Sequence, residues 1–407
     1  MRQNNNDVEL ITLIGIAHSI SHFFHLLIAP LFPWIKEEFG LSYSELGLLM
    51  TVFYVSSFIT QSISGIWVDR HGARPILYIG ISLLIAGAML VGVSQYYWML
   101  LLGMAITGIG NGVFHPVNYT LINHLVKPKN LPHAYSVHGV TGYLGWAAAP
   151  LFLLSITALV GNWRVAVFGA GLLAAAVLLL LILRKDLLND VPVVHEQTEL
   201  QSMPLFSKHT VEFLKLPNIW LSWLFFYLTA FSFVGIQSFS STALVDIYHI
   251  DITQTTASYT LYMISSAVGL IAGGFVATKI EQPDRVITGA FLASGVATIF
   301  AGFGFFAPWS IPLLFAIMGF GSGMASPSRD LMVRAATPKG SSGKVFGLVY
   351  SGIDCGSATG PILFGLFMDW KSPEIIFYGI AFFQIIAIFV ASQLNSHNLA
   401  RLSEQHN

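Results

Sequence analysis

The chain has very little charge for its length. Of its 407 residues, 10% are charged and 55% are hydrophobic, and the mean hydropathy is +0.70. Soluble domains carry about 25% charged residues, so most of this surface is expected to face lipid. The formal net charge of −1 gives no excess of basic groups for nucleic-acid binding.

Several other features are scarce or missing. The single cysteine, Cys355, excludes an intrachain disulfide. Neither the nucleotide-binding loop G-x-x-x-x-G-K-[S/T] nor the zinc-protease motif H-E-x-x-H occurs, which argues against nucleotide-driven transport and against a zinc protease. We therefore expect neither an enzyme nor a resident cofactor. The first residues, MRQNNNDVEL, lack the basic region and cleavage site of a signal peptide, so a retained first span is expected.

Long apolar runs are what the sequence does contain. A membrane-spanning helix needs about 20 mostly apolar residues. Reading for such runs predicts an all-α integral membrane protein of about twelve transmembrane helices, at residues 9–34, 44–67, 75–94, 97–125, 133–160, 163–183, 218–247, 254–278, 286–306, 310–335, 343–368 and 373–394.

The basic residues of the loops predict the orientation, because cytoplasmic loops are enriched in lysine and arginine. One set of loops and tails carries only Lys36, Arg164 and Lys371. The opposite set carries Arg2, Arg70, Arg74, Lys127, Lys129, Arg184, Lys185, Lys208, Lys215, Lys279, Arg285, Arg334, Lys339, Lys344 and Arg401. We expect a multi-pass protein of a bacterial inner membrane with both termini in the cytoplasm.

A long polar segment and an internal repeat divide the chain. Residues 184–218 interrupt the spans, so we expect a six-helix bundle at 1–184, a cytoplasmic linker at 185–217 and a second six-helix bundle at 218–407. The stretch GIGNGVFHP resembles GFGSGMASP in the second half. Landmarks 211 positions apart are Pro116 and Pro327, Gly145 and Gly356, and Pro150 and Pro361. Parallel halves of this kind place a substrate path between them.

The loop after the second span carries a family signature. Its sequence GIWVDRHGARP resembles the G-x-x-x-D-R-x-G-R/K-R loop of the major facilitator superfamily, through Gly65, Asp69, Arg70, Gly72 and Arg74. The resemblance implies that family's fold of two six-helix bundles and a charge latch that closes the cytoplasmic side. Gly65 is expected to allow a close helix contact, Gly72 to turn the chain, and Asp330 of the tenth span to meet the latch.

A narrower resemblance concerns one branch of this superfamily. The stretches EFGLSYSELGLLMTVFYVSS and GIGNGVFHP resemble the fosmidomycin-resistance-type branch, which includes proton-driven drug exporters. Val117 follows the F-H-P tripeptide, where the branch's drug exporter carries an acidic residue. This departure argues against the same drug as the substrate.

The stretch GIAHSISHFFHLLIAP, residues 15–30, places three imidazoles in the first span. His18, His22 and His25 are spaced i, i+4 and i+7, which aligns them on one face of a helix. Contacts to substrate or protons, polar packing and a metal site are the alternatives, since histidine titrates near pH 6.5. Three ligands from one straight helix rarely converge on one ion, so no metal is assigned and His22 is the first candidate for transport.

Further polar residues inside spans complete the candidate site. His115 precedes Pro116 in the fourth span with Asn111 one turn earlier, and His138 of the fifth span is expected to meet His115. In the second half we select Gln237, Arg329 and Asp354. A buried carboxylate must be paired or protonated, and an Arg329–Asp354 pair is expected.

These observations predict a proton-coupled secondary transporter. It would move a small polar or anionic organic compound by alternating access, with export slightly favoured by the branch resemblance. The alternative is a proton-symport importer of a metabolite or a metal chelate. The expected partners are substrate, protons and membrane lipids, with the chain acting as a monomer.

Overall fold

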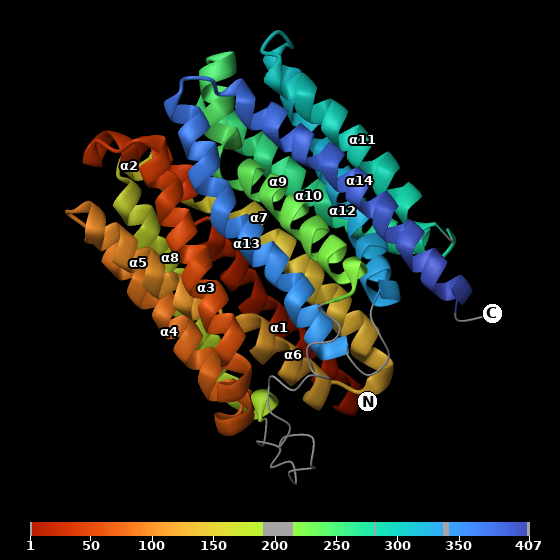
Figure 1. Ribbon diagram of the computed structural model, residues 1–407. Helices are drawn as coiled ribbons and strands as arrows, with labels where there is room; N and C mark the ends of the chain where they lie inside the picture. Colours follow the sequence, from red (N-terminus) through yellow and green to blue (C-terminus); the bar gives the residue numbers. More distant parts are fainter. Residues whose placement is uncertain (1, 190–214, 281, 337–341, 405–407) are drawn as a thin grey trace.

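The computed structural model describes residues 2–189, 215–280, 282–336 and 342–404, and no strand occurs among them. Figure 1 shows long helices running side by side along one common direction. The linker expected at 185–217 lies for the most part outside the described residues, so its boundaries stay a prediction.

The N-terminal half, as we call α1 to α8, is one bundle. Its helices are α1 (Arg2–His25), α2 (Phe32–Phe39), α3 (Tyr43–His71), α4 (Ala73–Gly92), α5 (Tyr97–Asn111), α6 (Phe114–Leu125), α7 (Leu131–Val160) and α8 (Trp163–Leu183). The main pairs in it are α1 with α7, α3 with α5, and α4 with both α5 and α8. They bury an apolar core that continues into the second half.

The C-terminal half, α9 to α14, is the second bundle. Its helices are α9 (Pro217–Tyr248), α10 (Ile252–Ala277), α11 (Pro283–Gly302), α12 (Ile311–Ala336), α13 (Ser342–Asp369) and α14 (Glu374–Glu404). Within the described residues, eleven helical segments are long and apolar enough to cross a membrane. The 28-residue α13 runs along α9 and α3 beside them. The expected all-α membrane fold of about twelve spans is confirmed.

Two of the expected spans are interrupted. The first ends as an α-helix at His25 and continues after a 3-10 turn, Ala29–Leu31, into α2. The fourth breaks after Asn111 and begins again at Phe114. Pro116 lies in the first turn of the new helix, where its missing N–H costs no hydrogen bond. The interruption covers Gly112 and Val113, whose backbone dihedrals stay in the right-handed helical region, and His115 stands on the short helix that follows it.

One landmark pair of the internal repeat, Gly145 and Gly356, makes equivalent contacts in the two halves. A Cβ at Gly145 of α7 would lie 2.2 Å from the Ser19 carbonyl oxygen of α1. A Cβ at Gly356 of α13 would lie 2.4 Å from the Tyr227 carbonyl oxygen of α9. Equivalent glycines thus let equivalent helices approach in the two halves, as small residues do in membrane proteins.

The two halves meet tightly at the end of the bundle that holds α2 (Figure 1). Thr51 of α3 donates a 2.6 Å hydrogen bond to the Ala358 carbonyl of α13, and a Cβ at Gly47 would lie 2.2 Å from the Pro361 carbonyl oxygen. Closer still to that end, the Asp369 carboxylate of α13 accepts hydrogen bonds from the first backbone N–H groups of α3. We call this end, defined by Tyr43, Gly47 and Asp369, the sealed end.

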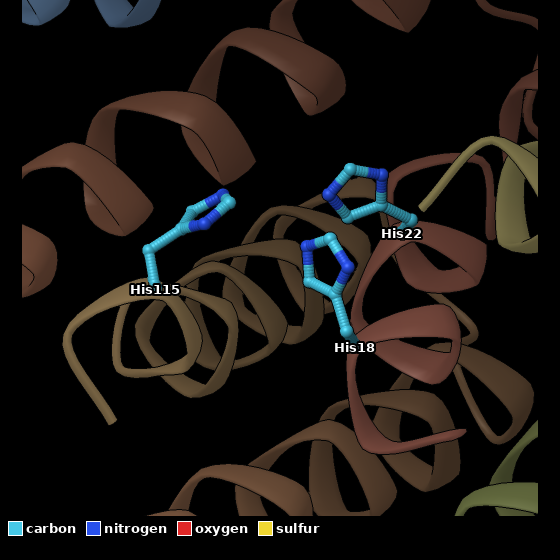
Figure 2. A group of neighbouring side chains, drawn as sticks. All are labelled: His18, His22 and His115. Atoms are coloured by element: carbon cyan, nitrogen blue, oxygen red, sulfur yellow. The ribbon is translucent and has the colours of Figure 1, made fainter. Parts of the chain in front are cut away.

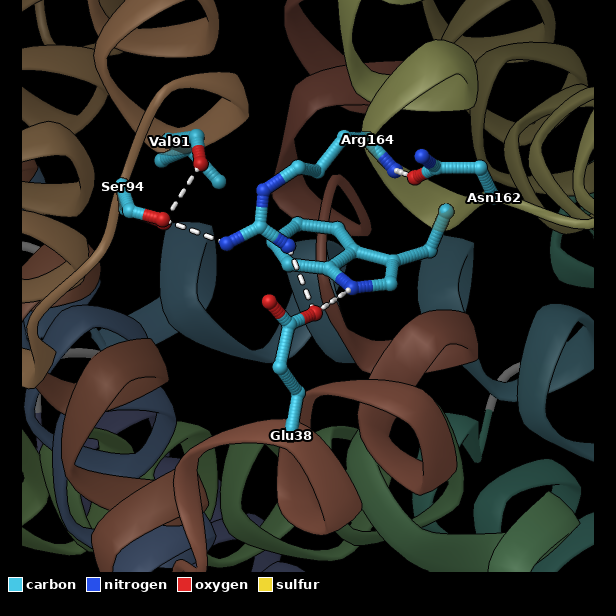
Figure 3. A network of polar contacts seen from close by, with 6 residues as sticks. Glu38, Val91, Ser94, Asn162 and Arg164 are labelled. Carbon is cyan, nitrogen blue, oxygen red and sulfur yellow. Dashed lines mark hydrogen bonds and ion pairs between the residues drawn. The ribbon is translucent and has the colours of Figure 1, made fainter.

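A polar network holds the N-terminal half together at the sealed end (Figure 3). Arg164 at the start of α8 donates to Glu38 of α2 at 2.6 Å and to the Ser94 carbonyl between α4 and α5. The Trp163 indole donates to the same Glu38 oxygen at 2.7 Å, and the Asn162 side chain caps α8. One arginine therefore ties three parts of the bundle to each other.

Candidate functional site

Five histidines from three helices gather in the middle of the N-terminal half. We call them the histidine cluster, and they are His18, His22 and His25 of α1, His115 of α6 and His138 of α7. The ring of His18 stacks on that of His138 with centroids 3.5 Å apart, and it lies 4.3 Å from His22 and 5.4 Å from His115. His115 and His138 approach to 5.9 Å, so their expected contact is confirmed.

Three rings of the histidine cluster are buried and only partly hydrogen-bonded, whereas His25 and His115 are partly exposed. His18, His22 and His138 are 2%, 7% and 4% exposed. His18 Nδ1 lies 2.7 Å from the carbonyl oxygen of His138. Within the described part of the chain, five buried side-chain atoms around the cluster have no hydrogen-bond partner, namely His18 Nε2, His22 Nδ1, His22 Nε2, Asn118 Oδ1 and Trp146 Nε1.

Such a density of unpaired polar atoms is unusual. Most buried polar side-chain atoms in proteins are hydrogen-bonded, and leaving one unpaired costs about 1–3 kcal/mol. Buried groups without a protein partner are usually satisfied by a bound water, ion or ligand. The arrangement can offer hydrogen bonds or nitrogen lone pairs to a bound molecule.

Backbone packing explains why the rings lie as they do. Gly142 of α7 faces the cluster, and a Cβ there would lie 2.7 Å from His22 Nδ1 and 3.0 Å from His18 Cε1. The missing side chain gives the two rings their space. One turn further along α7 the Trp146 indole packs against the His22 ring, with the ring centroids 4.1 Å apart.

The cluster continues toward the C-terminal half through aromatic and amide side chains. Trp146 meets Phe233 of α9 at 4.9 Å, and His25 lies edge-on to Tyr54 of α3 at 5.7 Å. The Tyr54 hydroxyl donates to Gln237 Oε1 of α9 at 3.1 Å. His25 of the first half and Gln237 of the second are therefore linked through Tyr54, between the two parallel repeats.

Asn111 lies beside the histidine cluster, and its side-chain amide is hydrogen-bonded to two serines. Its Oδ1 accepts from Ser21 at 2.8 Å and its Nδ2 donates to Ser57 at 2.9 Å. These bonds join α1, α5 and α3 at the point where the fourth span breaks. The geometry gives Asn111 a role in positioning the helices that carry His25 and His115.

The expected Arg329–Asp354 pair is wrong. Arg329 of α12 pairs instead with its neighbour Asp330 at 3.0 Å and lies 4.6 Å above the Phe226 ring. Among the described residues Asp354 of α13 makes no ion pair. Counting residues from the ends of their spans placed Arg329 and Asp354 at the same depth in the membrane. Depth alone does not determine which face of its helix a side chain occupies.

The structure agrees with only some of the roles expected for the residues of the latch. Gly72 has φ +83° and joins α3 to α4, as its turn role predicts. Arg74 donates to the Lys185 carbonyl at 3.4 Å, Arg70 is exposed, and the Asp69 side chain lies outside the described residues. The close helix contact expected at Gly65 is wrong, since a Cβ there would have no atom within 4 Å. Latching by these residues and Asp330 stays a prediction.

Several residues around the histidine cluster and at the sealed end could not be predicted from the sequence. Tyr54, Trp146 and Asn118 gave no signal because aromatic and amide residues are common in membrane spans. Asp369 lies at the end of a span, where an acidic residue attracts no attention.

Comparison with known proteins agrees with this architecture. The profile of the Major Facilitator Superfamily matches residues 14–315 and 238–403. The fosmidomycin resistance protein of Escherichia coli is 24% identical over 375 residues, which are 92% of this chain and 90% of that protein. The membrane sensor protein UhpC of Salmonella typhimurium is 24% identical over 306 residues, covering 71% of this chain and 68% of that protein.

Solved structures share the fold at low sequence identity. An inward-facing, unoccupied bacterial homologue of the human lysosomal transporter Spinster has a TM-score of 0.79 and 16% identity, with 97% of this chain and 98% of that chain covered. The nucleoside transporter NupG has a TM-score of 0.76 and 12% identity, with 95% and 99% covered. The fold, the repeat and the family profile agree, and the chain belongs to the major facilitator superfamily.

Proposed function

We propose that this protein is a proton-coupled secondary transporter that moves a small polar organic compound by alternating access, with export favoured over import. It is a multi-pass protein of a bacterial inner membrane with both termini in the cytoplasm, the side indicated by the lysine and arginine asymmetry of its loops. The substrate binds between the histidine cluster and the Gln237 region.

The unpaired polar atoms of the histidine cluster carry the proposal. They lie inside the protein, away from lipid, and they adjoin the helices through which the halves meet. Polar groups at membrane depth are costly and mark substrate or ion pathways. A hydrogen-bonding compound that enters from the space between the halves would supply the missing partners.

The sealed end supports alternating access. With the termini in the cytoplasm, this end faces outward, so the described conformation is open to the inside or occluded. The contacts that close it join α3 of one half to α13 of the other, and they break together if the halves rock about the central site. A transporter of this kind alternates between two such closures.

Asp354 is the residue we assign to proton coupling. It is a half-buried carboxylate of α13, and it has no ion pair among the described residues. A carboxylate at this depth is stabilised by taking up a proton. Because α13 carries the contacts of the sealed end, gain or loss of that proton can bias the two conformations.

The proposed substrate class follows from the pairing of Arg329, and the proposed direction of transport follows from a relative. Asp330 neutralises Arg329, so a neutral or zwitterionic polar compound is better supported than a simple anion. The export preference rests on the 24% identity to a fosmidomycin resistance protein along 92% of this chain.

Proton flux in proteoliposomes tests the proposal. Purified protein is reconstituted with a pH-sensitive dye inside, and a library of polar metabolites and antibiotics is screened for compounds that move protons. We expect a small set of active compounds, whose flux is abolished by Asp354→Asn and reduced at least tenfold by His22→Gln. The exposed His71→Gln serves as the control. Active compounds that move equally well in all variants, or no active compound at all, would overturn the proposal.

A further inference from the structure

Three rings of the histidine cluster converge from two separate helices. One nitrogen from each of His18, His22 and His115 lies within 4.8 Å of the other two. Figure 2 shows these rings turned toward one another, with His18 and His22 projecting from α1 and His115 from α6. A single helix could not provide this geometry, and the break before α6 places the third ring opposite the first two.

The hydrogen bond of His18 prepares one nitrogen for a metal. A carbonyl oxygen only accepts, so His18 Nδ1, 2.7 Å from the His138 carbonyl oxygen, carries the proton. In the neutral ring Nε2 then holds a lone pair, and this atom has no partner among the described residues. Ligating histidines usually donate their second nitrogen to a carbonyl or carboxylate in this way, which fixes the ring and the tautomer.

His22 and His115 complete the set of donors. Neither ring nitrogen of His22 has a partner in the described chain, so either one can turn toward an ion. Ligand nitrogens at bonds of about 2.0–2.1 Å are about 3.3 Å apart in a tetrahedral site. The observed 4.8 Å limit therefore requires a small rotation of the rings.

We propose that His18, His22 and His115 bind a divalent transition-metal ion as the substrate or as part of it. This inference rests on the proposed role of the cluster as the substrate site, and it extends the substrate class proposed above from a polar organic compound to a metal ion, either free or in complex with such a compound. Imidazole suits Zn²⁺, Cu²⁺, Ni²⁺ and Fe²⁺ rather than Mg²⁺ or Ca²⁺. Three protein ligands leave a coordination position open, through which the ion can be taken up and released.

The charge of the site indicates the form in which the metal arrives. The convergent group among the described residues contains histidines and no carboxylate, so nothing in it neutralises a dication away from water. An anionic ligand in the open position would do so. A free hydrated cation and a metal complex with an organic acid share the same imidazole recognition, and the experiment distinguishes them.

Equilibrium binding to the purified full-length protein tests the inference without any transport step. The protein carries a histidine-free affinity tag and is stripped of metal in detergent. Co²⁺ is titrated alone and as its citrate complex, with visible absorption reporting nitrogen ligation, and Zn²⁺ is then used as the competitor. We expect one ion per chain, displaced by Zn²⁺ and not by Mg²⁺. Binding of Co²⁺ alone identifies the free cation, and binding only with citrate identifies the complex.

Matched variants connect the binding to the three rings. His18→Gln, His22→Gln and His115→Gln should each weaken Co²⁺ binding at least tenfold, whereas the exposed His71→Gln and His397→Gln should not. Thermal unfolding checks that each variant is folded, and His115 lies on a different helix from the others, so one misfolded variant does not decide the result. Absence of the cobalt spectrum with both probes, or unchanged binding in the triple variant, would overturn the metal assignment. Proton flux with a metal-free compound would still support the proposed transport.

Discussion

Asp369, the last residue of α13, caps the first turn of α3 in the other half, beginning at Tyr43. Its Oδ1 accepts from the Tyr43 backbone N–H at 2.7 Å, and its Oδ2 accepts from the Ser44 N–H at 2.9 Å. The first N–H groups of a helix lack partners within it and carry a partial positive charge. A carboxylate from one half therefore stabilises a helix of the other half only while the sealed end is closed.

Removing this carboxylate should weaken the sealed end. We expect Asp369→Ala to cost about 1–2 kcal/mol, the usual value of a helix N-cap, and so to change the ratio of the two conformations about 5- to 30-fold. Disulfide trapping between Thr51→Cys and Ala358→Cys, in a Cys355→Ser background, measures closure. Oxidation should crosslink the parent rapidly and the Asp369→Ala variant more slowly. The exposed Glu37→Gln on α2 is the control, and equal rates in all three would contradict the role of Asp369.

Gly142→Ala should disturb the histidine cluster selectively. The new methyl group would lie 2.7 Å from His22 Nδ1 and 3.0 Å from His18 Cε1, so the rings must move or the overpacked core loses about 1–3 kcal/mol. Gly139→Ala is the matched control one turn earlier, because its nearest contact is an ordinary 3.6 Å to Leu270. Proton flux and the melting temperature should both fall for position 142 only. Similar behaviour of the two variants would show that the rings do not depend on this space.

Asn111→Ala should destabilise the N-terminal half. It removes the bonds to Ser21 and Ser57 and leaves two buried hydroxyls to find other partners, a loss of about 1–3 kcal/mol. The exposed Asn123→Ala, which removes a single bond to Tyr135, is the comparison. Thermal unfolding in detergent measures both. If the two variants melt at the same temperature, the bridge between α1, α3 and α5 contributes nothing measurable.

A double-mutant cycle separates the two possible partners of Arg329. Losses from Arg329→Ala and Asp354→Ala should add to within about 0.5 kcal/mol, as for independent sites. The cycle of Arg329→Ala with Asp330→Ala should give a coupling of up to about 1 kcal/mol, because the pair is partly exposed. Chemical unfolding of each single and double variant provides the values. Strong coupling to Asp354 with none to Asp330 would restore the pairing expected from sequence.

The fold was predictable because the membrane imposes simple rules. Apolar runs of about 20 residues, the repeat around Pro116 and Pro327, and the small residues of α13 each follow from local composition. Pro116 marked the fourth span as a place where the helix is disturbed. It did not locate the interruption at Gly112 and Val113, since a proline in a helix interior and one in a first turn cannot be told apart from the local sequence.

The candidate site was predictable in its members but less so in its contacts. The stripe of His18, His22 and His25 follows from helical periodicity, yet the approach of His115 depends on how α6 packs against α1. The partner of Arg329 could not be predicted either, because it is the adjacent Asp330 and not Asp354, which lies at a similar depth in the membrane. Gly65 looked like a packing glycine, but no neighbouring helix reaches it.

Spin-label distances at the two ends of the bundle test the central claim, that the halves alternate about the histidine cluster. In a Cys355→Ser background, one pair of labels is attached at Glu37→Cys and Lys371→Cys at the sealed end. A second pair is attached at His71→Cys and Lys279→Cys at the opposite end. Between the parent and Asp369→Ala, we expect the first distance to lengthen and the second to shorten. Two distances that stay fixed, or that lengthen together, would contradict alternating access in this protein.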